Sequence, residues 1–474
     1  MNSVSFYIPD NLDLKSLLSI QYPKMVKHID KFYYVINKLY VTKFLDKRYT
    51  NATPILPYSL PQSSVSNPII YSNSIYNINI IKDTAPATTT PYDVTFLGLP
   101  PSAHPPLMSC SHFTKFSQNT NQPRIYSSLS SQGKKAGKKL YIQLNISNLR
   151  KILTTRFSSK IINILIELGI IETDGQYIPS KKSKGYRLNE SYHNQHFLKV
   201  SVVNTIFEQK LVKLQQNHIL ALTPHHQQMF NLLGEFHLDE KHIELLDCSQ
   251  GITTNQLLSV RLACDKIRRK DYYFSTDSKT GRIFHNFSNI KKEYRKCILD
   301  SEDLPLVDID ISNSQPFFLS LILIANNICG NDVELYHELT KQGKLYDYIA
   351  DKCNQNRSYV KDKIIIMLFG KNEWEFLVKK CFIEQFPNVY AVIERYKENN
   401  QNELALELQR READFMINTL SPILIEKNIK FLTVHDSLMV SQKDAYYVHN
   451  MMKDTFIDYC GVTPTLKMTD LQQN

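Results

Sequence analysis

Residues 304–312 read Leu304-Pro305-Leu306-Val307-Asp308-Ile309-Asp310-Ile311-Ser312, and this stretch decides the class of fold. Apolar and polar residues alternate along it, as they do in a β-strand with one buried face. Asp308 and Asp310 therefore lie on the same face of the strand, where their charges repel each other unless a cation lies against them. The stretch predicts a strand that presents a metal ligand. A solvent-facing acidic edge strand is the alternative reading of this segment by itself.

A second apolar stretch, Phe431 to Val440, carries a carboxylate at its centre. Its two apolar arms meet at His435-Asp436, a pattern that predicts a β-hairpin with Asp436 at the tip. Taken by itself, an aspartate at a turn is ordinary surface chemistry. Beside the strand that carries Asp310, it supplies a second carboxylate. Two such carboxylates can hold the divalent metal ions that phosphoryl transfer uses.

A predicted helix between these two stretches has one face suited to binding a nucleotide. The residues that recur every four positions on this face are Arg357, Lys361, Ile365 and Phe369, and Gly370 ends the helix. Two cations one turn apart can bind a triphosphate, and an aromatic ring can stack on a base. A basic surface stripe is the alternative, but it does not account for the ring that completes the series.

In this order, the three stretches resemble motifs A, B and C of the family A DNA polymerases and the single-subunit, phage-type RNA polymerases. Asp310-Ile311-Ser312 is similar to the Asp-x-Ser of motif A. Residues 357–370 match the Arg-x3-Lys-x7-(Tyr/Phe)-Gly of motif B without a gap, and His435-Asp436 matches motif C. Thr280-Gly281-Arg282 and the segment 408–414 resemble two further parts of the DNA enzymes. The resemblance covers about residues 277 to 445.

The resemblance implies an α+β right-hand polymerase, with an antiparallel palm sheet and helical fingers. It implies two Mg²⁺ ions, which Mn²⁺ can replace, bound by Asp310 and Asp436. It assigns catalysis to the same two aspartates and Lys361. The residues that it implies for nucleotide binding are Arg357, Lys361, Phe369, Gly370 and Gln315. The residues that it implies for contact with a DNA primer-template are Arg282, Gln409 and His435.

Several departures from the family pattern bear on the activity. Gln315 stands where the DNA enzymes carry a Glu that screens out the ribose 2′-hydroxyl, and Ser437 follows motif C as in the RNA enzymes. A second register would make Asp308 the metal ligand, at the expense of the Asp-x-Ser match. Gln409-Arg410-Arg411-Glu412 replaces a Gln-Gly-Thr-Ala pattern. Residues 1–166 contain no Glu, so they cannot hold the Asp-x-Glu of a proofreading exonuclease.

Positive charge is concentrated between residues 131 and 200. This segment has 13 Lys or Arg and four Asp or Glu, and thus carries nearly all of the chain's net charge of +10. A localised positive field favours a polyanion such as nucleic acid. A solvated basic surface is the alternative.

Within this basic segment, the pattern predicts two helices and a hairpin. The helices are expected at 146–153 and 160–168, the second capped by Ser158-Ser159 and closed by Gly169. Asp174-Gly175 is a hairpin turn signal, and a basic loop follows it. This order resembles a winged helix-turn-helix, which predicts DNA contacts, and a protein-packing module is the alternative. The predicted DNA-binding side chains of the hairpin are Lys181, Lys182, Lys184 and Arg187.

The remaining segments complete the predicted domain order. It is an N-terminal helical segment (1–50, with a helical stretch at 14–44), a Pro-, Ser- and Asn-rich connector (51–135, with one short strand at 93–97), the basic winged-helix-like region (136–200), a helical region that could serve as a thumb (201–276), and palm and fingers (277–474).

The composition excludes several classes of protein. Hydrophobic residues make up 42% of the chain and charged residues 22%, as in soluble globular proteins. The apolar runs are too short to span a bilayer, and the N-terminus lacks the pattern of a signal peptide. The eight cysteines are scattered singly, which predicts reduced thiols and no structural zinc. We expect a cytoplasmic protein, or one associated with the nucleoid or a virus, with no membrane partner and an oligomeric state left open.

Three functions remain in view. The first is a DNA-directed DNA polymerase that uses DNA primer-template and nucleoside triphosphates and replicates a mobile element such as a phage, plasmid or transposon. The second is an RNA polymerase or primase-like enzyme of the same superfamily. The third is a non-catalytic, DNA-binding replication initiator that has kept the palm. Retention of both metal carboxylates and of the cationic helix face argues against the third.

Overall fold

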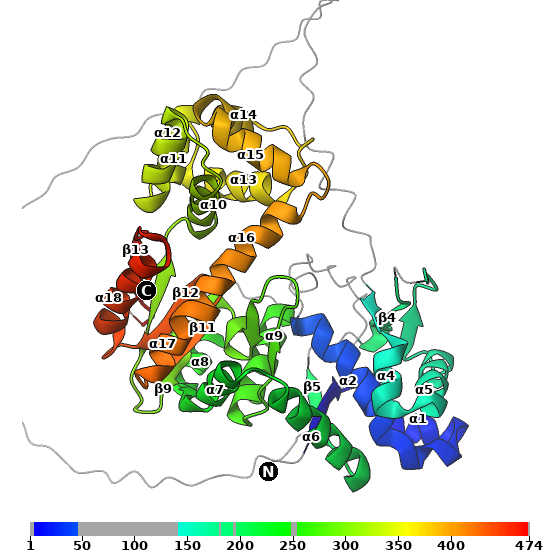
Figure 1. The fold of residues 1–474 in the computed structure, drawn as a ribbon. Helices are drawn as coiled ribbons and strands as arrows, with labels where there is room; N and C mark the ends of the chain where they lie inside the picture. The colour runs from blue at the N-terminus through cyan, green and yellow to red at the C-terminus, as the bar shows by residue number, and fades with distance from the viewer. Residues whose placement is uncertain (1–3, 46–140, 180–181, 193–195, 248–253, 473–474) are drawn as a thin grey trace, which may run out of the picture. The chain divides into compact units, whose positions relative to one another are not determined.

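The computed structural model describes residues 4–45, 141–179, 182–192, 196–247 and 254–472 (Figure 1). These residues belong to one compact unit made of residues 1–52 and 138–474. The predicted connector, its short strand and Lys181 lie outside the described residues. None of the described helices is both long enough and apolar enough to span a bilayer. Helices and small antiparallel sheets make up the described part, in agreement with the predicted α+β class.

A four-stranded antiparallel sheet holds the first and last motifs. Its strands follow the order β11-β12-β10-β13. Their bounds are Leu306–Ile311 (β10), Phe431–Val434 (β11), Ser437–Ser441 (β12) and Leu466–Asp470 (β13). The predicted strand and hairpin are thus confirmed, and β10 pairs with both β12 and β13. Helix α18, Ala445–Cys460, packs against β10, β12 and β13 and covers one face of the sheet (Figure 1).

A group of helices follows β10 directly. Their bounds are Ser314–Ala325 (α10), Asn331–Lys341 (α11), Leu345–Cys353 (α12), Arg357–Phe369 (α13), Leu377–Gln385 (α14), Pro387–Lys397 (α15) and Glu403–Ala413 (α16). Helix α10 is apolar on every side, and residues 314–323 are all buried. Such a helix needs partners all round, and α11 and α16 pack against it. The predicted helix at 357–369 is confirmed as α13.

Helix α16 runs from this group of helices towards the sheet (Figure 1). The helix type changes after Ala413. It continues as a π-helical segment, Asp414–Leu420 (η6), and then as α17, Ser421–Glu426. Pro422 has no N–H for the carbonyl one turn earlier, which disrupts regular α-helical bonding ahead of it. Side chains satisfy part of the freed backbone. Ser421 Oγ donates to Met416 O at 2.7 Å, and Thr419 Oγ1 donates to Asp414 O at 3.1 Å.

Residues 201–276 are mainly helical, as predicted. The helices are Thr205–Leu220 (α6), Pro224–Leu232 (α7), Glu240–Asp247 (α8) and Thr254–Arg268 (α9). Two short antiparallel pairs accompany them: Phe236–Leu238 (β6) with Ile298–Asp300 (β9), and Phe274–Thr276 (β7) with Ile283–His285 (β8). The 3₁₀ turns in this part are Leu233–Glu235, Phe287–Asn289 and Lys292–Cys297.

The N-terminal residues and the basic segment share a second hydrophobic core. Its helices are Leu14–Gln21 (α1), Ile29–Leu45 (α2), Ile146–Leu153 (α4) and Thr155–Glu167 (α5). Ser5–Pro9 (β1) pairs with Phe197–Ser201 (β5), and Ile142–Gln143 (β2), Gly185–Leu188 (β4) and Ile171–Thr173 (β3) form a sheet in the order β2-β4-β3. Helix α9 contributes Leu258 and Leu262 to this core.

Three sequence predictions in this part need correction. The helical stretch at 14–44 is interrupted at Pro23, where a 3₁₀ turn, Pro23–His28, separates α1 from α2. The second basic helix begins at Thr155, so Ser158 lies inside it, buried, and does not cap it. Asp174-Gly175 does not close a two-residue hairpin, because β3 pairs with β4. Gly169 does close α5, with φ +66°, as predicted.

Candidate active site

The sheet register brings the two predicted metal carboxylates together. Asp310 lies opposite Ser437 in the β10–β12 pair, and Ile311 N donates to Asp436 O at 3.3 Å. His435, with φ +59°, makes the left-handed turn that ends β11 just before Asp436. Burial, followed by the negative charges of Asp436 and Asp308, raises the pKa of Asp310 to about 7. The carboxylates are therefore close enough to repel one another.

Asp308 is a third carboxylate on the same face of β10. Burial raises its pKa, while a hydrogen bond from Ser437 and the charge of Arg295 oppose the rise. Its Oδ1 is buried and has no hydrogen-bond partner among the described residues. Its charge also raises the pKa of Asp436, after the larger effect of burial. Asp310 and Asp308, the two candidate metal ligands of motif A, therefore both lie on this face of β10.

These oxygen donors suit a hard divalent cation. Carboxylates that are buried and repel each other gain most from a shared positive charge, and Mg²⁺ prefers such ligands. Within the described ranges, no group of three or more His, Cys, Asp or Glu side chains is arranged to hold a metal ion. The site as built thus offers Asp310 and Asp436, with Asp308 beside them. Solvent and a substrate phosphate would have to complete the coordination of a Mg²⁺ ion.

Helix α13 brings positive charge to the carboxylates. The charge of Lys361 lowers the pKa of both Asp310 and Asp436, against the larger effect of burial. Arg357, at the first turn of the helix, pairs with Asp347 at 2.8 Å and lies over the ring of Tyr346 at 5.8 Å. Burial raises the pKa of Tyr346, and the charges of Asp436, Arg357 and Asp310 also act on this side chain. Strand, hairpin and helix therefore meet at one place.

The end of α13 is sterically tight. Phe369 is partly buried and packs against the main hydrophobic core. Gly370 follows it with an ordinary negative φ, so the glycine is not required for backbone conformation. A Cβ atom at this position would lie 2.6 Å from Ile366 O and 2.8 Å from the ring of Trp374. Glycine is needed here because the chain passes close to its own helix, which the motif match did not reveal.

Gln315, predicted to contact the nucleotide, is tied to a residue that sequence reasoning did not select. Its Nε2 donates to Glu412 on α16, and Ser314 Oγ donates to Glu412 Oε2 at 3.0 Å. Arg282, in the turn between β7 and β8, donates from Nη2 to Glu412 Oε1. Glu412 is 1% exposed, and burial raises its pKa to about 7, with the charge of Asp436 adding to the effect.

A sequence signal for Glu412 did exist. The buried residues of α16 include Leu404, Leu408 and Glu412, which recur every four positions. A carboxylate in register with the apolar face of an amphipathic helix is a buried charge, and a buried charge needs partners. The family comparison noted Glu412 only as part of a departure from the usual pattern. The helical periodicity would have identified it.

The residues predicted to contact primer or template lie partly together. Arg282 and His435 line one small cavity, with Ile283, Ala413, Ile417 and Thr433 as its other walls. The ring of His435 meets that of Phe284 edge-on, with centroids 5.6 Å apart. Gln409 lies on α16, partly buried, one turn before Ala413. These positions agree with a shared surface beside the carboxylates.

The basic hairpin has fewer available charges than the sequence indicated. Arg187 is 8% exposed and pairs with Glu172 at 2.7 Å and Glu190 at 3.1 Å. Lys182 pairs with Asp174 at 3.1 Å, and Lys184 is exposed. Asp174 Oδ1 also accepts from Gly185 N at 2.8 Å, which anchors the end of the loop. Arg187 thus has an internal role in holding β3 and β4 together.

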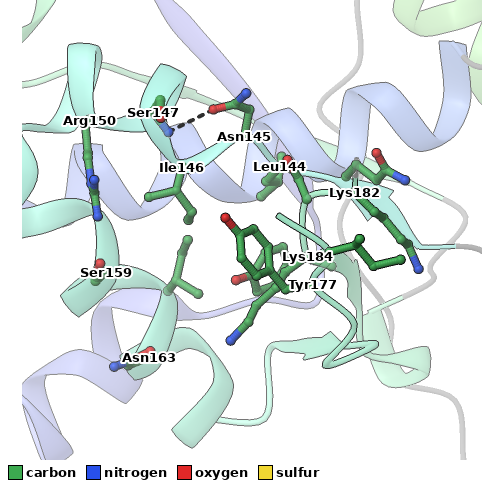
Figure 2. Close-up of a pocket in the computed structure, with 15 residues that line it drawn as sticks. Leu144, Asn145, Ile146, Ser147, Arg150, Ser159, Asn163, Tyr177, Lys182 and Lys184 are labelled. Atoms are coloured by element: carbon green, nitrogen blue, oxygen red, sulfur yellow. Dashed lines mark hydrogen bonds between the residues drawn. The ribbon is translucent and has the colours of Figure 1, made fainter. Parts of the chain in front are cut away.

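An open pocket of about 670 Å³ lies between this hairpin and the two helices before it. Figure 2 shows Arg150 on α4, and Ser159 and Asn163 on α5, across from Tyr177 and Lys184 of the hairpin segment. Its polar side chains also include Asn145, whose Oδ1 caps α4 by accepting from Ser147 N at 2.9 Å. The pocket adds Arg150 to the cations of this module.

Comparison with known proteins adds little to this geometry. No family model matches the chain, and no curated protein matches its sequence. Among solved structures, the chain is similar to the POL domain of Pol1 from M. smegmatis, in a complex with DNA primer-template and dNTP. The identity is 14% and the TM-score 0.33, over 48% of this chain and 54% of that chain. A similarity of this size does not establish a common fold, and the functional argument rests on the site itself.

Proposed function

We propose that this chain is a template-directed nucleotidyltransferase, specifically a DNA-directed DNA polymerase. One observation carries the proposal. Asp310 and Asp436, from separate parts of the sequence, lie close enough to repel each other, and the charge of Lys361 acts on both. Two partly buried carboxylates with a cation of a neighbouring helix acting on both are the arrangement that metal-assisted phosphoryl transfer requires.

Each residue has a defined task in this proposal. Asp310 and Asp436 would hold two Mg²⁺ ions, or Mn²⁺ in their place, with Asp308 as a further ligand. The metal ions supply activation of the attacking hydroxyl and stabilisation of the leaving oxygen. Lys361 and Arg357 would bind the triphosphate through charge-assisted hydrogen bonds. The residues left for orienting the base, the sugar and the primer-template are Phe369, Gly370, Gln315, Arg282, Gln409 and His435.

The remaining parts of the proposal concern the rest of the chain. Residues 136–200 would act as a winged-helix-like anchor on DNA, through Lys181, Lys182, Lys184 and the pocket residue Arg150. Residues 201–276 would serve as a thumb. The setting would be the replication of a mobile element, in the cytoplasm or in association with a nucleoid or virus. These parts rest on charge and on the order of the elements.

The decisive experiment is extension of a labelled 3′-recessed DNA primer with Mg²⁺, with dNTPs and rNTPs supplied separately. Asp310→Ala and Asp436→Ala are compared with the parent protein. Asp303→Asn is the matched control, because Asp303 is 82% exposed in a turn and pairs with His237. Extension with dNTPs that is lost in both alanine variants and kept in the control supports the proposal.

Other outcomes select the alternatives. Extension with rNTPs alone would favour an RNA polymerase or primase-like enzyme. DNA binding with no extension, on primed or single-stranded templates, would favour a non-catalytic replication initiator. Extension that persists in both alanine variants would mean that the two carboxylates do not hold the metal ions.

A further inference from the structure

The proposed chemistry gives no task to Glu412, a buried charge next to the candidate site. Glu412 is 1% exposed, and its carboxylate joins parts of the chain that are far apart in sequence. It accepts hydrogen bonds from Arg282 in the β7–β8 turn and from Ser314 and Gln315 at the start of α10. A carboxylate kept from water persists only when donors surround it. Such a residue fixes the relative positions of its donors.

The contact determines the orientation of the Gln315 amide. Both Glu412 oxygens accept hydrogen bonds, Oε1 from Arg282 and Oε2 from Ser314 and Gln315, so the amide nitrogen of Gln315 faces Glu412 and its amide oxygen faces away. Gln315 is 8% exposed, and its Oε1 is buried without a hydrogen-bond partner among the described residues. The side chain is therefore held at its tip and enclosed along its length.

Gln315 also lies near the candidate chemistry. It follows Asp310 by five residues, across the turn at Asn313 that joins β10 to α10. Glu412 binds Arg282, and Arg282 lines one small cavity with Ala413, the residue after Glu412, and His435, the residue before Asp436, so the contact between Gln315 and Glu412 lies near the carboxylates that would hold the metal ions. A bulky side chain at this position can reject a larger sugar only if it cannot move out of the way.

We propose that Glu412 is a positioning residue for nucleotide selection: it holds Gln315 rigid, so that Gln315 excludes the ribose 2′-hydroxyl. This inference rests on the proposed function and deepens it. Glu412 touches neither the nucleotide nor the metal ions in this scheme. It acts through Gln315. Glu412 also accepts a hydrogen bond from Arg282, which links Gln315 to a residue proposed to contact the primer-template.

The test is a double-variant cycle of Glu412→Ala and Gln315→Ala, read as the ratio of kcat/KM for a dNTP to that for the matching rNTP. We expect Gln315→Ala to lower this discrimination about tenfold or more, and Glu412→Ala to lower it by a similar factor. The double variant should be no less selective than Gln315→Ala alone, because Glu412 acts through Gln315. Glu412→Gln keeps an acceptor oxygen and should retain most of the discrimination.

A matched control comes from the same helix. Glu407 pairs with Arg411 at 2.9 Å and with Arg410 at 3.5 Å, so Glu407→Gln also removes a paired carboxylate from α16. This variant should leave the ratio unchanged. If Glu412→Ala slowed incorporation of both nucleotides equally, or if its effect added to that of Gln315→Ala, Glu412 would have a general structural role and the proposal would be wrong.

Binding distinguishes a failure of this inference from a failure of the proposed function. With Ca²⁺ in place of Mg²⁺, the affinities of the parent and the variants for dATP and ATP are measured in the presence of primer-template. If the parent incorporates neither nucleotide, the polymerase proposal fails. A preference for dATP in the parent that disappears in Glu412→Ala would still support the positioning role, and equal affinities for both nucleotides in the parent would overturn it.

Discussion

Charge is arranged in opposite ways in the four-stranded sheet and in the β3–β4 hairpin. In the sheet, Asp310 and Asp436 are partly buried, and burial together with the charge of Asp436 raises the pKa of Asp310. In the hairpin, Arg187 is more fully buried, but it meets Glu172 and Glu190 and its charge is balanced. The hairpin pairs resemble ion pairs that hold a fold together. The like charges in the sheet repel one another and are only partly offset by nearby cations such as Lys361, and carboxylates with raised pKa values are typical of functional sites.

Removing a carboxylate from the sheet should have the largest effect. Asp310→Asn and Asp436→Asn should each lower primer extension by about 10³-fold or more, because in the proposed function either change removes a metal ligand. The same changes should leave the metal-free protein as stable as the parent, or raise its midpoint of thermal unfolding, since they relieve repulsion between like charges. Rates and melting curves measured on the same preparations check both parts.

The opposite change in the hairpin sharpens the contrast. Arg187→Met removes the charge that balances Glu172 and Glu190, and should destabilise the protein by about 3 kcal/mol, as the loss of one partner of a buried pair does. Primer extension per folded molecule should change little. If Arg187→Met were as stable as the parent and Asp310→Asn were strongly destabilised, the two regions would not differ in the way that their contacts indicate.

The difference between the regions also explains which features the sequence could predict. Alternation gave β10, and the apolar arms around Asp436 gave the hairpin, because local periodicity governs both. The spacing of Arg357 and Lys361 likewise gave α13. The loop from Asp174 to Gly185 was not predictable in this way. The Asp174 side chain binds Gly185 N, eleven residues away, and thereby replaces the expected tight turn.

Long-range partners set the limit of sequence reasoning at the site as well. Gln315 was selected from its spacing to Asp310, but the residue that fixes its orientation is 97 positions away. Ser158 looked like a helix cap because two serines precede an apolar run. The helix instead starts earlier, and Ser158 Oγ donates to Thr155 O at 3.3 Å within its first turn. In both cases the contacts of the folded chain, and not residue type or spacing alone, decided what the side chain binds.

Acid should weaken the sheet region through His285. This side chain is buried beside β11, where its ring nitrogen Nε2 donates to Thr433 O at 2.9 Å. Burial lowers its pKa from 6.5 to about 4. The pKa of His285 is lower in the folded than in the unfolded protein. Its contribution to the free energy of unfolding is therefore fully present above pH 6.5 and is lost as the pH falls towards 4. The loss should be about 3 kcal/mol.

Urea unfolding between pH 7 and pH 4 measures this loss. His285→Gln keeps a donor for Thr433 O and removes the titration, so its stability should fall less steeply with acid. His449→Gln, at a partly exposed position on α18, is the matched control and should follow the parent. A variant His285→Gln with the same acid slope as the parent would mean that other groups cause the loss.

Lys361→Ala should have a smaller effect, on nucleotide binding. It removes one cation from the predicted triphosphate site, so the KM for the nucleotide should rise about tenfold, with a smaller fall in kcat. Lys363→Ala is the matched control. Lys363 is on the same helix as Lys361, and its ammonium lies over the rings of Tyr359 and Phe376. Equal effects of the two variants would show that α13 contributes only general positive charge.

The smallest effect per residue is expected in the basic module, where the charges face solvent. Arg150 and Lys184 line the pocket beside the hairpin, whereas Lys151 is exposed on α4 outside it. If both pocket cations contact phosphates, the double change Arg150→Ala and Lys184→Ala should reduce the slope of log K against log salt by about two. Lys151→Ala should reduce it by much less. This difference separates a phosphate-binding surface from diffuse positive charge, because a diffuse field would make all three residues equivalent. It also completes the contrast with the sheet. Losing a cation of the basic module should weaken DNA binding and leave the extension rate of the bound complex unchanged. Losing Asp310 or Asp436 should abolish primer extension and leave DNA binding intact.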